Sequence, residues 1–181
     1  VDAADSTGIT HNNSSSSLNF LFCTFYSTGA NNVLTGTAVG GIDFENCIFA
    51  LSATGTASTV AVGRILFNAC DMAGMKITTS DTGSVFAGSC YWQFGAQTLL
   101  TTAGTGTSEI YNSTLASTSA STISVGAGTT VNISNCQLSS SNTNVITGAG
   151  TLNYSGLAFT STSYGINTTT ISGNIFRPGI S

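Results

Sequence analysis

The sequence predicts an all-β fold, a right-handed parallel β-helix (β-solenoid) of about seven coils of 20–24 residues, with three short strands in each coil. Cysteines recur at spacings of 24, 23, 20 and 46 residues, the last being two steps of 23. Around these positions, apolar and polar residues alternate with the period of a strand that has one face in a core. A self-similar unit of this length is typical of stacked repeat architectures.

Seven rows of sequence share the same columns. They read LNFLFCTF, IDFENCIF, ILFNACDM, VFAGSCYW, SEIYNSTL, VNISNCQL and LNYSGLAF. Apolar residues stand five and three positions before the cysteine and two after it, as Ile42, Phe44 and Phe49 do in the second row. A further apolar cluster, seven to thirteen residues after the cysteine, predicts the third strand of each coil. Runs of Gly and Thr then predict a corner before the next row.

The cysteine column predicts a ladder of free thiols in the interior. Its members are Cys23, Cys47, Cys70, Cys90 and Cys136. Ser113 and Leu157 hold the same position in the other two rows. A free buried cysteine behaves as a small hydrophobe, whereas zinc needs four ligands that converge. We therefore expect neither a metal nor a cofactor.

The alternation changes phase just before the cysteine column, where Asn46, Asn112 and Asn135 stand. Asn adopts a left-handed backbone conformation more readily than most other residues with a side chain. These positions therefore predict a sharp structural corner between two strands.

Three segments are expected along the chain. Residues 1–17 are polar and lack the repeat, so we expect a flexible lead-in. Residues 18–171 form the β-helix, and residues 172–181 start a further coil or a cap. Because solenoid ends expose unpaired strand edges and neither end offers an obvious cap, we expect a piece of a longer chain or a rod capped by partners.

The composition argues against several functions. Charged residues make up 6% of the chain, against about 25% in ordinary domains. The only cations are Lys76, Arg64 and Arg177, and the formal net charge is −4, which argues against a nucleic-acid partner. The apolar runs are far shorter than the ~20 residues that span a bilayer, so no membrane insertion is expected. Low charge also suits a solenoid, because stacked like charges repel.

Asp43, Glu45 and Asp71 are the candidate catalytic residues. Asp43 and Glu45 point to the same outer face of one predicted strand, and Asp71 lies one coil further on. Glycosidases use two carboxylates about 5–10 Å apart, so a hydrolytic pair is conceivable. The other interpretation, which we favour, is an ordinary solvated polar face.

Outward apolar residues predict self-association. Leu66 and Phe86 share one outward column on consecutive coils, and Ile48 and Tyr91 point outward just after the cysteine column. Large apolar residues on the outside of a rod favour a partner surface, although scattered exposed apolar residues are common. Three parallel copies about a three-fold axis make a closed assembly, so we expect a homotrimer.

The rows VNISNCQLSSSNTNVITGAGTLNYSGLAFTSTSYGINTTT resemble the tandem β-helix repeats of bacteriophage tail fibre and tail spike proteins. The resemblance covers about residues 18–171. It implies an extracellular, virion-attached trimeric rod that contacts a host surface polysaccharide or receptor, or that spaces a tip domain. Some proteins of this kind hydrolyse polysaccharide. GGIDFENC also resembles the repeats of bacterial autotransporter adhesins, which are monomeric solenoids on cell surfaces.

Three functions follow as hypotheses. The first is a structural or receptor-binding segment of a phage tail fibre or spike. The second is a polysaccharide-degrading β-helix enzyme of hydrolase or lyase type that uses Asp43, Glu45 and Asp71. The third is a bacterial surface adhesin or filament subunit.

Overall fold

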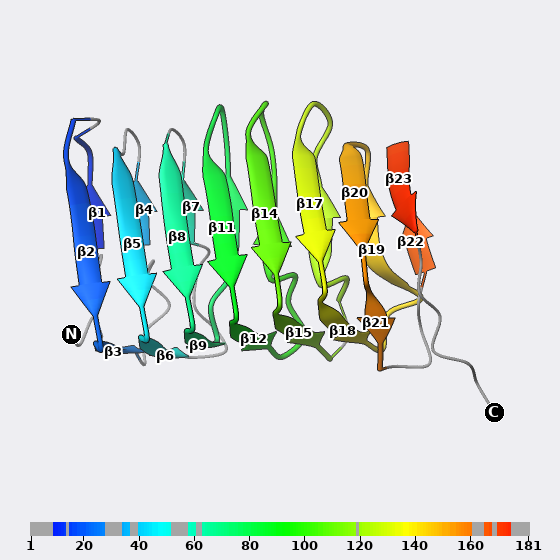
Figure 1. Ribbon diagram of the computed structural model, residues 1–181, viewed down its shortest axis with the longest axis horizontal. Coiled ribbons are helices and arrows are strands. Elements are labelled where there is room, and N and C mark those ends of the chain that lie inside the picture. The colour runs from blue at the N-terminus through cyan, green and yellow to red at the C-terminus, as the bar shows by residue number, and fades with distance from the viewer. Residues whose placement is uncertain are drawn as a thin grey trace.

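The computed structural model is a parallel β-solenoid built from three sheets, without a helix in the part of the chain described (Figure 1). The structure describes residues 9–13, 15–27, 34–36, 40–51, 58–60, 63–118, 120–160, 165–167 and 170–174. In Figure 1 each coil descends the front, turns at the bottom and rises at the back while the rod advances from left to right, which makes the solenoid right-handed. The predicted fold class is therefore confirmed.

The sheet that faces the viewer in Figure 1, here called the front sheet, has eight strands. In spatial order they are β2 (Ser17–Leu21), β5 (Gly41–Glu45), β8 (Arg64–Asn68), β11 (Ser84–Gly88), β14 (Thr107–Tyr111), β17 (Thr130–Ser134), β20 (Thr151–Ser155) and β23 (Thr170–Asn174).

Two further sheets complete each coil. The base sheet, at the bottom of Figure 1, has seven strands: β3 (Thr24–Ser27), β6 (Ile48–Leu51), β9 (Asp71–Ala73), β12 (Tyr91–Phe94), β15 (Thr114–Ser117), β18 (Gln137–Ser140) and β21 (Ala158–Phe159). The rear sheet has eight: β1 (Ile9–His11), β4 (Leu34–Gly36), β7 (Ser58–Val60), β10 (Ile77–Thr79), β13 (Leu100–Thr101), β16 (Ile123–Val125), β19 (Asn144–Gly148) and β22 (Gly165–Asn167).

The core is a set of columns in which each side chain lies beside its equivalent one coil away. Phe44 pairs with Phe20 on one side and Phe67 on the other. The ring of Phe44 stacks on both, with centroids 5.1 and 5.2 Å apart. Ile42 and Phe49 belong to the other two predicted apolar columns, and both are at most 1% exposed. The inward columns read from the alternation are thus confirmed.

A left-handed residue forms the corner between the front and base sheets in every coil. The φ angles are 53° at Phe22, 52° at Asn46, 52° at Ala69, 55° at Ser89, 50° at Asn112, 52° at Asn135 and 60° at Gly156. The corner N–H still pairs with the next coil, as when Ala69 donates to the carbonyl oxygen of Gly88 at 2.9 Å. The ladder of backbone hydrogen bonds therefore continues around the corner.

The structure describes a strand near each end of the repeat region. Within the expected lead-in, residues Ile9–His11 form β1 and pair with β4, and His11 is 7% exposed with its Nε2 atom 3.0 Å from the carbonyl oxygen of Ser16. Residues 9–11 thus belong to the rear sheet. At the other end, β23 adds an eighth strand to the front sheet and extends the repeat to residue 174. Residues 1–8 and 175–181 lie outside the described residues.

The corner conformation predicts a stabilising substitution. Ala69→Gly removes the Cβ atom from a residue with φ of 52°, where an L side chain costs roughly 1–2 kcal/mol. Glycine loses more backbone conformational entropy on folding than alanine does, and this offsets part of the gain. The free energy of unfolding should therefore rise by about 0.5–1 kcal/mol. Chemical denaturation followed by circular dichroism measures this change.

Ala73→Gly, at the last residue of strand β9, is the matched control. It should lower the free energy of unfolding by about 0.5–1 kcal/mol, because it brings the entropy cost without relieving strain. Equal destabilisation by both substitutions would contradict this account of the corner.

Candidate functional site

The three candidate acids do not form one cluster. Asp43 and Glu45 both lie on β5 of the front sheet, whereas Asp71 lies on β9 of the base sheet, in register with Ile48. The Asp43 carboxylate faces a cation: Arg64 Nη2 lies 3.4 Å from each of its oxygens. Among the described residues, no group of three or more His, Cys, Asp or Glu side chains is placed to hold a metal ion. The arrangement is that of an exposed polar strand with one ion pair.

The cysteine column lies beside the corner and contacts the backbone. Cys47, Cys70, Cys90 and Cys136 are buried, Cys23 is half-buried, and all five are free thiols. The Cys70 sulfur lies 3.3 Å from the carbonyl oxygen of Asn68 and 3.5 Å from that of Phe44 in the preceding coil. Ser113 does the same with its hydroxyl, which donates to the carbonyl oxygen of Tyr111 at 2.8 Å. The column therefore supplies hydrogen-bond donors to carbonyl groups next to the corner.

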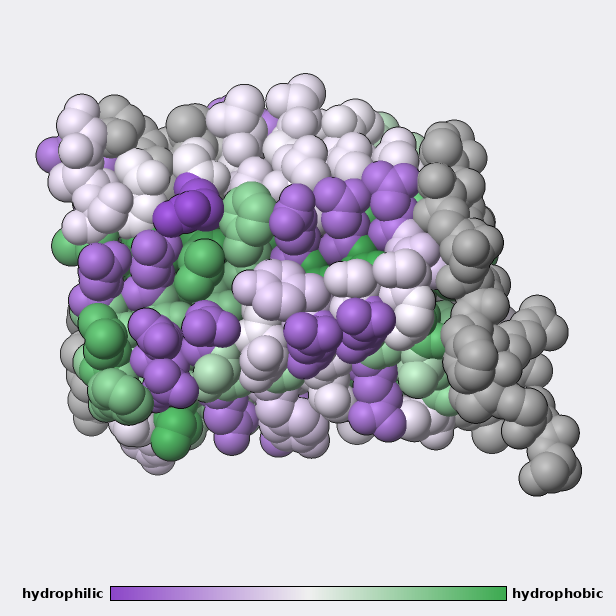
Figure 2. Space-filling view, viewed as in Figure 1, coloured by the Kyte–Doolittle hydropathy of each residue, from purple (hydrophilic) through white to green (hydrophobic). Residues whose placement is uncertain are grey.

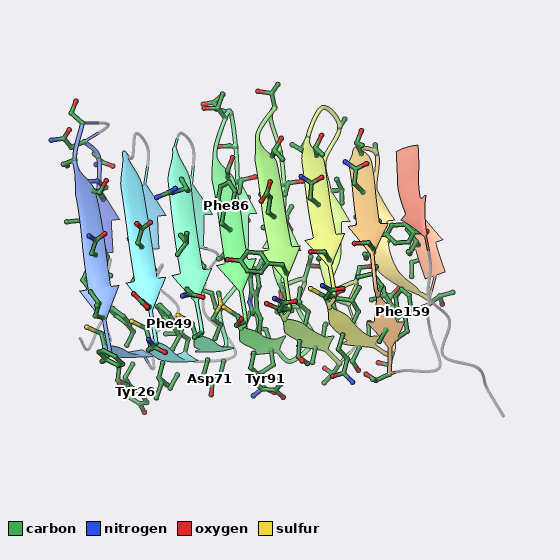
Figure 3. All side chains as sticks on the ribbon, viewed as in Figure 1. Tyr26, Phe49, Asp71, Phe86, Tyr91 and Phe159 are labelled. Atoms are coloured by element: carbon green, nitrogen blue, oxygen red, sulfur yellow. The ribbon has the colours of Figure 1, made fainter. Side chains whose placement is uncertain are left out.

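The four residues expected to mediate self-association lie on two sheets. Leu66 and Phe86 pair on β8 and β11 of the front sheet, and both are half-buried. Ile48 and Tyr91 face outward from the base sheet, 49% and 45% exposed, on either side of Asp71. Figure 3 shows Phe86 on the front sheet and Asp71 and Tyr91 below it on the base sheet. The two pairs thus flank one edge of the rod.

The outer surface of the described part changes along the rod. Its exposed large hydrophobic residues are Leu21, Phe22, Tyr26, Ile48, Tyr91 and Tyr111. All except Tyr111 fall within residues 21–91, and we call this stretch, with Leu66 and Phe86, the apolar half. Figure 2 shows green and purple residues side by side over the coils at the left, and mainly white and purple residues over the coils to the right. The coils from β14 to β20 therefore expose fewer large apolar side chains than the coils before them.

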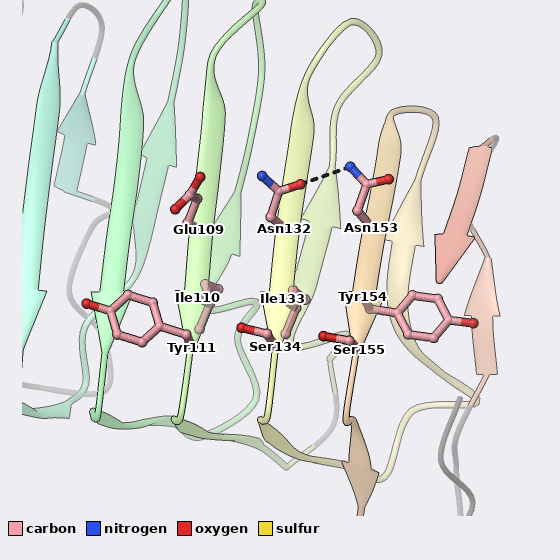
Figure 4. Close-up of a pocket in the computed structure, with 9 residues that line it drawn as sticks. All are labelled: Glu109, Ile110, Tyr111, Asn132, Ile133, Ser134, Asn153, Tyr154 and Ser155. Atoms are coloured by element: carbon pink, nitrogen blue, oxygen red, sulfur yellow. Dashed lines mark hydrogen bonds between the residues drawn. The ribbon is translucent and has the colours of Figure 1, made fainter. Parts of the chain in front are cut away.

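A shallow groove of about 470 Å³ crosses β14, β17 and β20 on the front sheet (Figure 4). Glu109, Asn132 and Asn153 form one wall, Tyr111, Ser134 and Ser155 form the other, and Ile110, Ile133 and Tyr154 lie beneath. We call this feature the outer groove. Parallel pairing sets both walls, because each wall residue lies in register with its equivalent on the next strand.

Two contacts shape the walls of the outer groove. Asn153 Nδ2 donates to Asn132 Oδ1 at 2.9 Å, which links the side chains of one wall across two coils. At the N-terminal end the Tyr111 ring lies over Gly88 of β11, where any Cβ atom would overlap the ring. Gly88 is therefore required for the ring to lie against the sheet, and the ring remains 38% exposed.

The outer groove is not apparent from the sequence. Its wall residues belong to outward columns, which the alternation assigns only to solvent. The one available signal is that Gly88 stands in register with Tyr111, since a glycine beside a large aromatic residue allows the ring to cover the neighbouring strand. Detecting it requires the register of the coils.

Comparison with known proteins gave no match to any family model, to any curated protein or to any solved structure. The described part of the chain also contains no helix with the length and apolar character that a membrane span requires.

Burial of the thiols predicts a loss of stability at alkaline pH. Burial raises the pKa of Cys136 in the folded protein, and hydrogen bonding with the backbone of Ser113 and Ser134 offsets this only in part. In the unfolded chain the thiol ionises near its ordinary pKa of about 8.5. Its contribution to the free energy of unfolding is therefore complete below about pH 8.5 and is lost as the pH rises through the folded pKa.

Cys136→Ser tests this effect, since Ser113 shows that a hydroxyl is accepted in the same column. Denaturation of both proteins between pH 7 and pH 10 should show the wild type losing stability relative to the variant as the pH increases. A difference that does not change with pH would contradict the assignment to Cys136.

Proposed function

We propose that this chain is a structural, receptor-binding segment of a bacteriophage tail fibre or tail spike. In this role it is part of the virion, outside the cell. It forms a rigid, trimeric rod that contacts host surface glycan or holds a tip toward it. The observation that carries the proposal is the apolar half, where large hydrophobic residues are exposed on two adjoining sheets of an otherwise low-charge rod.

The apolar half supports self-association for a physical reason. Soluble monomers seldom expose large contiguous apolar patches, and those that do use them for binding. Leu66 and Phe86 are central to the patch, and Asp43, Arg64 and Glu45 stand beside them on the front sheet. An apolar centre with a polar rim is the usual composition of a protein interface. Copies of one rod placed side by side about an axis present the same edge to one another.

The stiffness of the fold supports the role as a spacer. Every described coil is joined to the next by parallel pairing in all three sheets from β4 to β20. The polysaccharide-degrading alternative has no specific observation in its favour, because Asp43 is paired with Arg64 and Asp71 lies on another sheet. The adhesin alternative differs in predicting a monomer.

The molar mass in solution tests the proposal. Light scattering on a sizing column should give a mass near three times 18.3 kDa. The double substitution Leu66→Glu and Phe86→Glu should lower the mass to that of one chain, because it places six like charges in the interface of a trimer. Gln137→Glu, an exposed position on β18 of the base sheet, is the control and should leave the mass unchanged.

A wild-type mass near 18.3 kDa would overturn the trimer and favour the monomeric adhesin. Retention of the trimer by the double variant would instead show that the interface lies elsewhere on the rod.

A further inference from the structure

We propose that the outer groove binds an uncharged carbohydrate chain, with the Tyr111 ring as its aromatic contact. This inference rests on the proposed function, in which the rod contacts host surface glycan, and it specifies the site and the chemical class of the ligand. Both come from the side chains that line the groove.

The groove offers hydrogen-bonding groups that the protein does not use. Among the described residues, the Glu109 carboxylate, the Asn132 amide nitrogen and the Tyr111 hydroxyl have no protein partner. The Ser134 and Ser155 hydroxyls on the opposite wall likewise have none. Polar side chains that line both sides of one groove can serve as hydrogen-bonding groups for a ligand. Sugar hydroxyls, which both donate and accept, match this mixture.

The Tyr111 ring supplies the apolar contact that sugars also need. It is held over Gly88 and is 38% exposed at the end of the groove. A tyrosine fixed in this way presents a rigid, partly apolar surface with a polar tip, which suits the C–H face of a pyranose ring. From β14 to β20 the groove crosses two strand spacings, about 10 Å in all, which is close to the length of a disaccharide.

The charges near the groove exclude acidic ligands. Glu109 lies on one wall, and within the described strands of the front sheet Arg64 is the single Lys or Arg, engaged by Asp43 at 3.4 Å. A uronic or sialic acid, or a phosphate, would therefore meet a carboxylate without a compensating cation. Nucleic acid is disfavoured for the same reason.

The groove adjoins the proposed self-association surface but shares no residue with it. The apolar half ends with Phe86 on β11 and Tyr91 on β12, and the groove begins on β14, where Glu109 lies in register with Phe86. A protein partner would need an apolar centre, but both walls of the groove carry polar side chains apart from the Tyr111 ring. Glycan binding in the groove and self-association through the apolar half therefore use different residues, which meet where Phe86 lies beside Glu109.

Binding to immobilised polysaccharides tests the inference. The probes are neutral dextran, mannan, galactan and chitin oligosaccharides, compared with acidic alginate, hyaluronan and polysialic acid. The wild type should bind at least one neutral probe and none of the acidic ones. Affinity should change less than twofold between 50 and 500 mM salt, because no ion pair contributes.

Two substitutions test whether the carbohydrate binds in the outer groove. Tyr111→Ala should weaken binding at least tenfold, as expected for the loss of a central aromatic contact. Ser134→Arg should abolish it by filling the groove, and this variant keeps the test valid if Tyr111→Ala fails to fold. Gln137→Ala, exposed on β18, is the control and should bind as the wild type does. Thermal unfolding by circular dichroism verifies that each variant is folded.

The outcomes separate this inference from the proposed function. Binding to a neutral probe that survives both groove substitutions would overturn the site and leave glycan contact intact. Binding to acidic probes alone would overturn the ligand class. Absence of binding to every probe would overturn the outer groove as a site together with the receptor-binding part of the proposed function, while the trimeric rod is judged separately by its molar mass.

Discussion

Parallel backbone pairing between successive coils is the interaction on which the whole structure depends. It places each residue beside its equivalent, as in the stacked rings of Phe20, Phe44 and Phe67. The number of residues between equivalent positions varies from coil to coil, and the segments that connect the strands accommodate this variation. The registers within the front sheet are therefore unbroken from β2 to β23. Like side chains therefore become neighbours, which favours aromatic and amide columns and penalises columns of one charge. The low charge of the chain follows from this geometry.

The same pairing explains why strain is tolerated at the corner. Bulky or β-carbon-bearing residues rarely adopt positive φ, yet Phe22, Ala69 and Ser89 do so with φ between 52° and 55°. In this conformation their N–H groups reach carbonyl oxygens of the next coil, at 3.0 Å for Phe22 and 2.9 Å for Ala69. Each such hydrogen bond contributes about 1 kcal/mol, which offsets much of the strain, and the corner recurs at seven positions of the described chain. Adjacent thiols and the Ser113 hydroxyl supply further donors to the carbonyl groups there.

Sequence reasoning reached the fold because the alternation of apolar residues directly encodes the direction of each side chain. The corner is predictable where Asn46, Asn112 and Asn135 stand, because Asn favours the left-handed region. Phe22 and Ala69 have no such preference, so their sequence does not indicate the positive φ that they adopt. Strand β1 was missed because a short polar segment with one Ile forms a strand only through pairing with β4. The candidate acids were close in sequence, but the corner directs Asp71 to another sheet. The outer groove depends on contacts between coils, such as Tyr111 over Gly88, which no local pattern records.

The continuous register also makes the length of this rod a discrete quantity. Insertion or deletion of one whole coil moves everything beyond it by one strand spacing, about 4.8 Å, and leaves each column aligned. The outer groove begins on the coil that follows the apolar half, because β14 pairs with β11, so a coil inserted between them would move the groove away from the apolar half by one strand spacing. Because neighbouring repeats share a pattern, recombination between them in the gene can lengthen or shorten the reach of the rod in steps. Neither surface has to change its own residues when that happens.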